Sequence, residues 1–405
     1  MSFGIVEVIS LLLGMSGFGV QQNPKAPTAD VALQYAMPDA DVVVHVDAGA
    51  LVPGNYKVLQ GLPNQAGIKA SPELAQAVRK MINEVEGVRG LAKGATGIDL
   101  VNDINDATVF FQIVPRQDPT FVAVVHGKFA PANMDKIAKM SRGQVSKIGG
   151  GVIVEMQGGG SEPAIAVTKD GVMLAGTPKL VRDRLADTWK TPARAAGSNL
   201  AYAAEVLGQK PIFSLVLTMS KDARTEAVSK IGGKNFLTDV VQRHKLASFS
   251  VFHNGVGWSW VDSNKTGLDS MALVSEGAIE LFRAGHIAPR GIAKMVLGAM
   301  DSYRGTDKQV DELIRRKADV LKVVESYTGD GTFDAKIDKD PKALRLTVRA
   351  TGKSLSDVVP AGLFLPGAAA GFLMVGSTAP TPPPAKSAPP PQRATSPGLS
   401  APKKK

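Results

Sequence analysis

The sequence has 405 residues, of which 44% are hydrophobic and 21% are charged, and it contains no cysteine. This composition indicates a globular protein long enough for two domains, and it excludes disulfide scaffolds, thiolate metal sites and cysteine nucleophiles. The formal net charge is +10, but the part from Ser377 onward holds five basic residues and no acidic one, which leaves +5 for the rest of the chain. A mildly basic body with both signs interspersed does not favour nucleic-acid binding.

The first 29 residues contain an apolar stretch, IVEVISLLLGMSGFGV, from Ile5 to Val20. Its length suits the apolar region of a signal peptide, and Gly17 and Gly19 supply small residues before a cleavage site. However, no Lys or Arg precedes the stretch, and Glu7 interrupts it. Two interpretations follow: an export signal, which we favour, or a helix packed on a membrane or on the protein itself.

Residues 30–190 alternate strand and helix patterns that predict one α+β domain. The run Val42–Val46 is β-branched and continuous, which is typical of a buried strand. Ser71 followed by Pro72 is a helix N-terminus signal. Further strand patterns lie on both sides of the turn at residues 115–119 and in GVIVEM and AIAVTKDGVMLAG, and Pro178 starts a short helix.

After a linker at residues 191–199, a similar order of elements begins again in residues 200–352. A strand is predicted at residues 211–219, and Asn254-Gly255 predicts a tight hairpin. We expect helices at residues 269–285, 288–303 and 307–327, followed by a hairpin around residues 339–342. The predicted fold class is therefore α+β, with two tandem domains of antiparallel sheet packed with long amphipathic helices. The shared order favours a diverged duplication.

Catalytic motifs are sparse in this sequence. His45 and Asp47 alternate along the first strand and point to the same face, where such a pair can orient a proton-transfer group. The favoured alternative is that His45 is a half-buried structural residue and that Asp47 ends the strand. The sequence has no HExxH, phosphate-loop, calcium-loop or nucleophile-elbow pattern. We therefore assign no catalytic, cofactor-binding or metal-ligating residue and no cofactor, and His45 and Asp47 remain the candidates for a site.

Four phrases occur in order between residues 30 and 189: ATGIDLVNDINDATVFF, FVAVVHGKF, GGGVIVEM and GVMLAGTPKLVRDRLAD. This pattern resembles a loose class of uncharacterised bacterial cell-envelope proteins, periplasmic or membrane-anchored. The class has no agreed activity, so the resemblance implies an envelope location and no catalytic residues.

Residues 353–376 include the longest uncharged apolar run, from Val358 to Gly376. As a helix these 19 residues span about 28 Å, close to the thickness of a bilayer core. We favour a membrane anchor over a segment docked on the second domain. The apolar residues that define this candidate span are Val358, Leu363, Phe364, Leu365, Phe372, Leu373, Met374 and Val375.

Residues 377–405 form a proline-rich, basic tail that we expect to be disordered. If the preceding segment spans a membrane, the positive-inside rule places the tail in the cytoplasm and the two domains outside. The tip residues Lys403, Lys404 and Lys405 then suit an anionic lipid surface or a tail-binding partner.

These patterns lead to a functional hypothesis with two alternatives. We expect a non-enzymatic envelope scaffold or binding protein that acts through its domain surfaces and has a membrane or envelope protein as partner. The first alternative is a carrier of a lipid or other apolar ligand held between sheet and helices, and the second is a hydrolase with an unrecognised site. The alternative location is the cytoplasm, and the sequence leaves the oligomeric state open.

Overall fold

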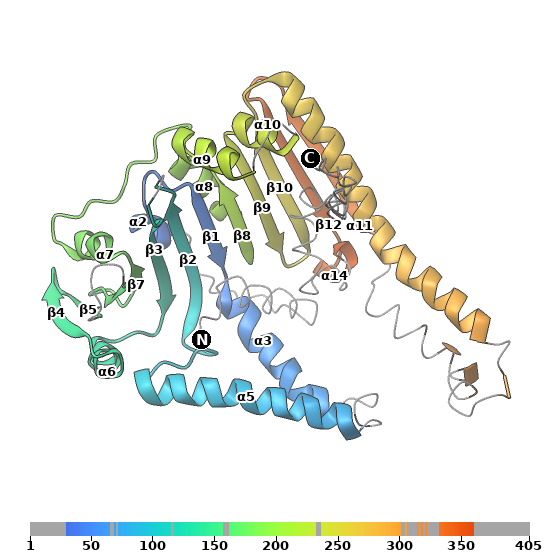
Figure 1. Ribbon diagram of the computed structural model, residues 1–405, viewed down its shortest axis with the longest axis horizontal. Helices are drawn as coiled ribbons and strands as arrows, with labels where there is room; N and C mark the ends of the chain where they lie inside the picture. The colour runs from blue at the N-terminus through green and yellow to red at the C-terminus, as the bar shows by residue number, and fades with distance from the viewer. Residues whose placement is uncertain are drawn as a thin grey trace, which may run out of the picture.

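The computed structural model describes residues 30–359, apart from 65–68, 70–71, 115–116, 157–161, 232–235 and most of 301–331 (Figure 1). The apolar N-terminal stretch, the basic tail and all of the candidate membrane segment beyond Val359 therefore lie outside the described residues. Val358 lies inside them, at the end of a four-residue helix, and is buried.

One antiparallel sheet of 12 strands contains strands from both predicted domains, in the order β11-β12-β10-β9-β8-β1-β2-β3-β7-β6-β5-β4. The two sets of strands meet where β1 pairs with β8, so that Val44 lies between Val109 of β2 and Leu215 of β8. The sheet thus passes from one predicted domain into the other without a break (Figure 1). The strands are β1 Val42–Val46, β2 Ile104–Gln112, β3 Thr120–Gly127, β4 Gln144–Ile148, β5 Gly151–Glu155, β6 Ala164–Val167, β7 Met173–Gly176, β8 Phe213–Leu217, β9 Leu246–Phe252, β10 Gly255–Val261, β11 Asp334–Asp340 and β12 Arg345–Thr351.

Helices pack on both faces of this sheet, because successive strand side chains point to opposite faces. Val43 faces a first core shared with α2, α7 and α8, whereas Val44 and Val46 face a second core shared with α3, α11 and α14. A third core under α6 lies on the same face as the second, since Val125 borders it and Val46, Ala107 and Val125 are in register. The helices are α2 Asp30–Gln34, α3 Ala48–Gly61, α5 Pro72–Thr96, α6 Pro131–Ser141, α7 Pro178–Leu185, α8 Asn199–Gly208, α9 Lys221–Ile231, α10 Phe236–Arg243, α11 Lys265–Met300 and α14 Leu355–Val358, with a short 3-10 turn, η2, at Leu62–Asn64.

The α+β class is confirmed, as are several local elements: strand Val42–Val46, the helix that begins at Pro72, and the hairpin that turns at Asn254-Gly255. The expected helix break after residue 285 is wrong, because α11 runs unbroken through Pro289. A proline inside a helix removes one backbone hydrogen bond and crowds the carbonyl four residues earlier, yet the helix continues and buried residues recur beyond it. Leu268 and Ile279 before the proline and Leu297 after it are all buried.

A buried carboxylate joins the two halves at the top of the central strands. Asp41 precedes β1, and its side chain accepts hydrogen bonds from the backbone N–H of Ile113 at 2.8 Å and of Ser220 at 2.5 Å. Ile113 follows β2 and Ser220 follows β8, so one side chain satisfies backbone donors from both halves. The carbonyl of Asp41 also accepts a hydrogen bond from the N–H of Thr218. These bonds hold the β1–β8 junction, where the candidate site lies.

Candidate functional site

His45 lies in the middle of β1, on the sheet face that also holds Val43 and the first core. The strand register places it opposite Thr108 of β2 on one side and Ser214 of β8 on the other. Its Nδ1 lies 2.9 Å from Thr108 Oγ1. Burial lowers the pKa of His45 to about 4, although the nearby Asp106 carboxylate opposes the shift. The imidazole is therefore neutral at pH 7.

Asp47 does not bond to His45 in the described part of the chain. Its Oδ1 instead accepts a hydrogen bond from the backbone N–H of Ala50 at 2.9 Å. Asp47 thus occupies the N-cap position of α3, where a carboxylate satisfies a free backbone donor and complements the helix dipole. Burial raises the pKa of Asp47, and the Ala50 hydrogen bond opposes that rise. His45 and Asp47, which the sequence pattern placed together, therefore have separate hydrogen-bond partners.

An imidazole–carboxylate pair does form on the same face, one row further along. Asp106 of β2 and His126 of β3 are directly opposite in register, and both are buried. His126 Nδ1 lies 2.8 Å and 2.9 Å from the two carboxylate oxygens. A carboxylate only accepts hydrogen bonds, so Nδ1 carries a proton, and Nε2 is the ring nitrogen that faces away from Asp106. That Nε2 is buried and has no hydrogen-bond partner among the described residues.

These residues form a central polar cluster, which we define as His45, Asp106, Thr108, His126 and Ser214. All five are buried, and Ser214 Oγ also lacks a hydrogen-bond partner in the described structure. An oriented Asp–His pair is two thirds of the arrangement that activates a nucleophile. No described hydroxyl lies within hydrogen-bonding distance of His126 Nε2. Within the described residues, no group of three or more His, Asp or Glu side chains is arranged to hold a metal ion.

The hairpin register could have revealed the Asp106–His126 pair from the sequence. The β2–β3 hairpin is centred on residue 116, so residues ten positions before and after that centre face each other. The sequence indicates the turn at residues 115–119, and counting outward from it pairs Asp106 with His126. No local sequence pattern predicts that His45 lies opposite Ser214, because this register depends on the contact between β1 and β8.

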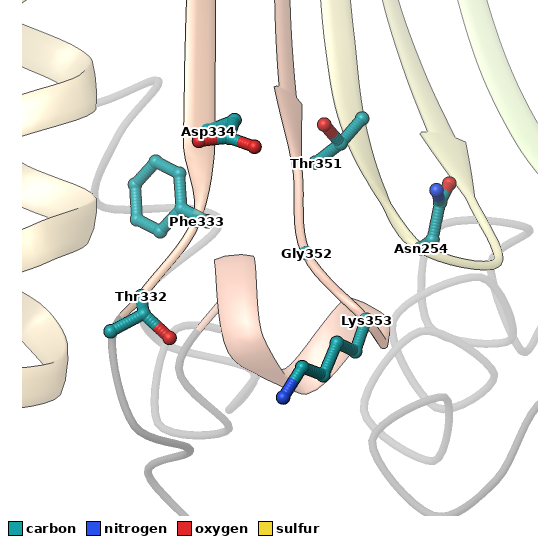
Figure 2. Close-up of a pocket in the computed structure, with 7 residues that line it drawn as sticks. All are labelled: Asn254, Thr332, Phe333, Asp334, Thr351, Gly352 and Lys353. Atoms are coloured by element: carbon teal, nitrogen blue, oxygen red, sulfur yellow. The ribbon is translucent and has the colours of Figure 1, made fainter.

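An open cleft lies at the β11–β12 end of the sheet, far along the strand order from the polar cluster (Figure 2). It has a volume of about 640 Å³. Three strand ends supply its walls: the β9–β10 turn, the start of β11 and the end of β12. Asp334 and Thr351 face each other in register across β11 and β12, and Phe333 is buried against His286 of α11. The lining residues are Asn254, Thr332, Phe333, Asp334, Thr351, Gly352 and Lys353.

The chemistry of this edge cleft suits binding. One carboxylate, one ammonium group, an amide, two hydroxyls and an aromatic ring supply hydrogen-bonding groups of both polarities. The cleft also lies near the place where the described chain ends. Val358 is packed in the second core, and its carbonyl accepts a hydrogen bond from His286 Nε2 at 3.0 Å.

Comparisons with known proteins add little to this geometry. No protein-family model matches the sequence, and no curated protein is similar to it. A solved structure titled "Structure of crystal form I of TP0453" aligns with 82% of this chain and 95% of its own, with a TM-score of 0.32 and 9% sequence identity. A likeness at that level supports no inference about fold or function. Among the described residues, no helix has the length and apolar character needed to cross a bilayer.

Proposed function

We propose that this chain is a non-enzymatic scaffold or binding protein of the bacterial cell envelope that acts through its surfaces. The observation that carries the proposal is the solvent exposure of large apolar side chains on two long helices. On α5, Val88 is 61% exposed and Leu91 is 75% exposed. On α11, Leu273 is 70% exposed and Met295 is 69% exposed. Apolar side chains gathered on outward helix faces are typical of interaction surfaces.

The position of α5 supports this role. The helix runs beside α3, beyond the ends of the central strands (Figure 1). Arg89 holds it there: its guanidinium donates two hydrogen bonds to Asp99, at 2.9 Å and 2.7 Å, and one to Tyr56 of α3 at 3.1 Å. The inner side of α5 is thus fixed by polar contacts, while Val88 and Leu91 remain on its outer side.

The polar cluster supports binding over catalysis. His45 is neutral and lies against Thr108, Asp47 caps a helix, and His126 faces no described nucleophile. The carrier hypothesis draws no support from the methionines of α11 as far as they are described. Met271 packs against the second core, whereas Met295 faces outward.

Paired charge substitutions on α5 test the surface role. The Val88→Glu/Leu91→Glu variant should fold normally by circular dichroism. When it is expressed in a strain that lacks the chromosomal gene, it should fail to complement the loss of the wild-type protein. A His126→Gln variant should retain function if the cluster is structural. The proposal is wrong if the α5 variant works as well as wild type, or if His126→Gln keeps its fold and loses all function.

The envelope location is a separate proposal with its own test. We propose that the candidate span anchors the chain in the inner membrane, with the domains in the periplasm and Lys403–Lys405 in the cytoplasm. Because Val358 packs in the second core, such a span begins after Val359, and 17 residues to Gly376 cover about 26 Å as a helix. With a tag at each end, protease added to spheroplasts should degrade the domains and spare the C-terminal tag. Protection of both tags in spheroplasts would instead place the chain in the cytoplasm.

We further propose that the two halves are a diverged tandem duplication. The proposal is supported by the order of elements: α2, β1, two helices and the β2–β3 hairpin are matched by α8, β8, two helices and the β9–β10 hairpin. The first strands of the halves, β1 and β8, pair antiparallel at the centre of the sheet. An experimental structure tests this, because residues 30–190 superposed on 200–352 should align β1, β2 and β3 with β8, β9 and β10.

A further inference from the structure

Helix α11 carries two apolar faces. Its inner face packs in the second core through Leu268, Ala272 and Ile279. Large apolar residues also lie on the opposite side: Leu273, Leu281 (58% exposed), Ile287 (66% exposed) and Met295. Since each residue turns the helix by about 100°, these four fall within an arc of about 120° that faces away from the core. An ordinary surface helix has one apolar stripe, so the second requires an explanation.

Small residues lie between the large ones on the outward side. They recur every seven residues and complete what we call the outer stripe. No atom lies within 4 Å of the position that a Cβ would take on Gly277, Gly291 or Gly298, so this side of the helix is open. Small residues at such positions allow the backbone of another helix to approach closely. The outer stripe consists of Ser270, Leu273, Gly277, Leu281, Ala284, Ile287, Gly291, Met295 and Gly298.

The outer stripe is symmetric about Ala284. Leu281 and Ile287 lie three residues before and after it, and Gly277 and Gly291 lie seven before and after it. The same holds for the outer pairs: Leu273 and Met295 lie eleven residues away, and Ser270 and Gly298 lie fourteen. If a second copy of α11 packs antiparallel on the first with the two Ala284 residues facing each other, large residues face large ones and small residues face small ones. A twofold interface needs this self-complementarity, because each contact occurs twice.

The charges beside the stripe have the same complementarity. Glu276 lies before Ala284 and Lys294 lies after it, whereas Glu280, also before Ala284, falls within the arc of the stripe itself. All three side chains are exposed, and Glu276 and Lys294 project from the same flank of the helix. In the antiparallel arrangement, Glu276 of one copy lies within a turn of Lys294 of the other. A parallel arrangement would place Glu276 and Lys294 of the two copies 18 residues apart along the helix axis, about 27 Å, too far to pair.

We propose that the outer stripe of α11 pairs with the same stripe of a second copy, antiparallel, about a twofold axis at Ala284. The stripe spans four heptads, about 42 Å, which is enough for a two-helix interface. The helix is accessible for it, because α11 lies at the β11–β12 end of the sheet and extends beyond the strands (Figure 1). The inference rests on the proposed surface role and names the partner of one surface.

Single cysteines in the otherwise cysteine-free full chain test the geometry directly. Ala284→Cys places two thiols at the twofold axis, so mild oxidation should produce a disulfide-linked dimer on a non-reducing gel. Gly298→Cys is the matched control on the same stripe. Its two copies lie about 42 Å apart in the antiparallel pair and should not crosslink. Crosslinking of both variants would show a parallel pair and overturn the proposal, as would crosslinking of neither.

Charge exchange gives a second readout that does not depend on oxidation. By sedimentation equilibrium, Glu276→Lys and Lys294→Glu should each raise the dimer dissociation constant roughly 5- to 10-fold, since each change affects two symmetric pairs. The double variant should restore the wild-type constant. A wild-type chain that is monomeric at tens of micromolar overturns the proposal, as does one that binds anionic vesicles through the stripe without dimerising. If pairing fails while the α5 variant still loses function, the surface role stands and only the dimer is wrong.

Discussion

His126 Nδ1 lies 2.8 Å from the nearer carboxylate oxygen of Asp106, while the opposite ring nitrogen is buried without a partner among the described residues. The pair therefore satisfies one side of the imidazole and leaves the other unsatisfied. The two residues lie on adjacent strands of one hairpin, close to the β1–β8 junction at which the two halves meet. Their contact contributes to the alignment of the hairpin with the rest of the sheet.

Loss of the Asp106 carboxylate should destabilise the fold. Asp106→Ala leaves the His126 Nδ1–H unpaired in a buried position, and such a donor costs about 1–3 kcal/mol. Urea denaturation should show this decrease in the free energy of unfolding. Asp338→Ala is the control, because Asp338 forms an exposed ion pair with Lys336 and should change stability by less than about 0.5 kcal/mol. Equal effects of the two substitutions would contradict the structural role of the Asp106–His126 pair.

Acid should weaken the fold through His45. Its pKa is about 4 in the folded chain and near 6.5 when unfolded. The unfolded chain therefore binds more protons between those values, and stability falls as pH decreases from about 6.5 to 4. The loss attributable to this one residue is about 3 kcal/mol at most. His45→Asn cannot titrate there, so its urea midpoint should change less than the wild-type midpoint between pH 7 and pH 4.5. Parallel pH curves would contradict the burial of a neutral His45.

Substitution of Asp41 should loosen the junction between the halves. Asp41→Ala removes the acceptor for the backbone N–H groups of Ile113 and Ser220, and two unpaired donors together cost about 2–6 kcal/mol. Asp39→Ala, two residues earlier and exposed, should be nearly neutral. The free energies of unfolding of the two variants can be compared by urea denaturation. Similar values for both would mean that Asp41 does not hold the junction.

The two faces of α11 should respond differently to truncation. Ile279 is 5% exposed and packs in the second core, so Ile279→Ala should cost about 2–4 kcal/mol. Leu281 lies two residues further on the outward face, so Leu281→Ala should change the stability of the monomer by less than about 0.5 kcal/mol. Both are measured by urea unfolding at a protein concentration low enough to keep the chain monomeric. A large loss for Leu281→Ala would mean that the outer stripe is already covered within one chain.

Much of the local structure could be predicted because it depends on neighbouring residues. The β-branched run Val42–Val46 forms β1, Pro72 starts α5, and Asn254-Gly255 turns the β9–β10 hairpin. Candidate chemistry was harder to predict. His45 and Asp47 do not share a strand, because β1 ends at Val46 and Asp47 caps α3. Their partners, Thr108 and the Ala50 N–H, come from tertiary contact and from the start of a helix. The contact between Asp106 and His126 depends on the strand register of the β2–β3 hairpin, and the sequence was used to predict only the turn of that hairpin.

The amino-acid sequence by itself determined the α+β class, the strand at Val42–Val46 and tight turns such as Asn254-Gly255, because these follow from local patterns. It did not indicate α3, α6, α9 or α10. Only the tertiary structure decided that both halves share one sheet, since β1 and β8 are about 170 residues apart and their pairing has no local signal. It also decided that α11 continues through Pro289, because burial of one continuous face compensates for a lost hydrogen bond. That continuity produces the outer stripe of α11, whose symmetry about Ala284 would be lost if the helix broke in two.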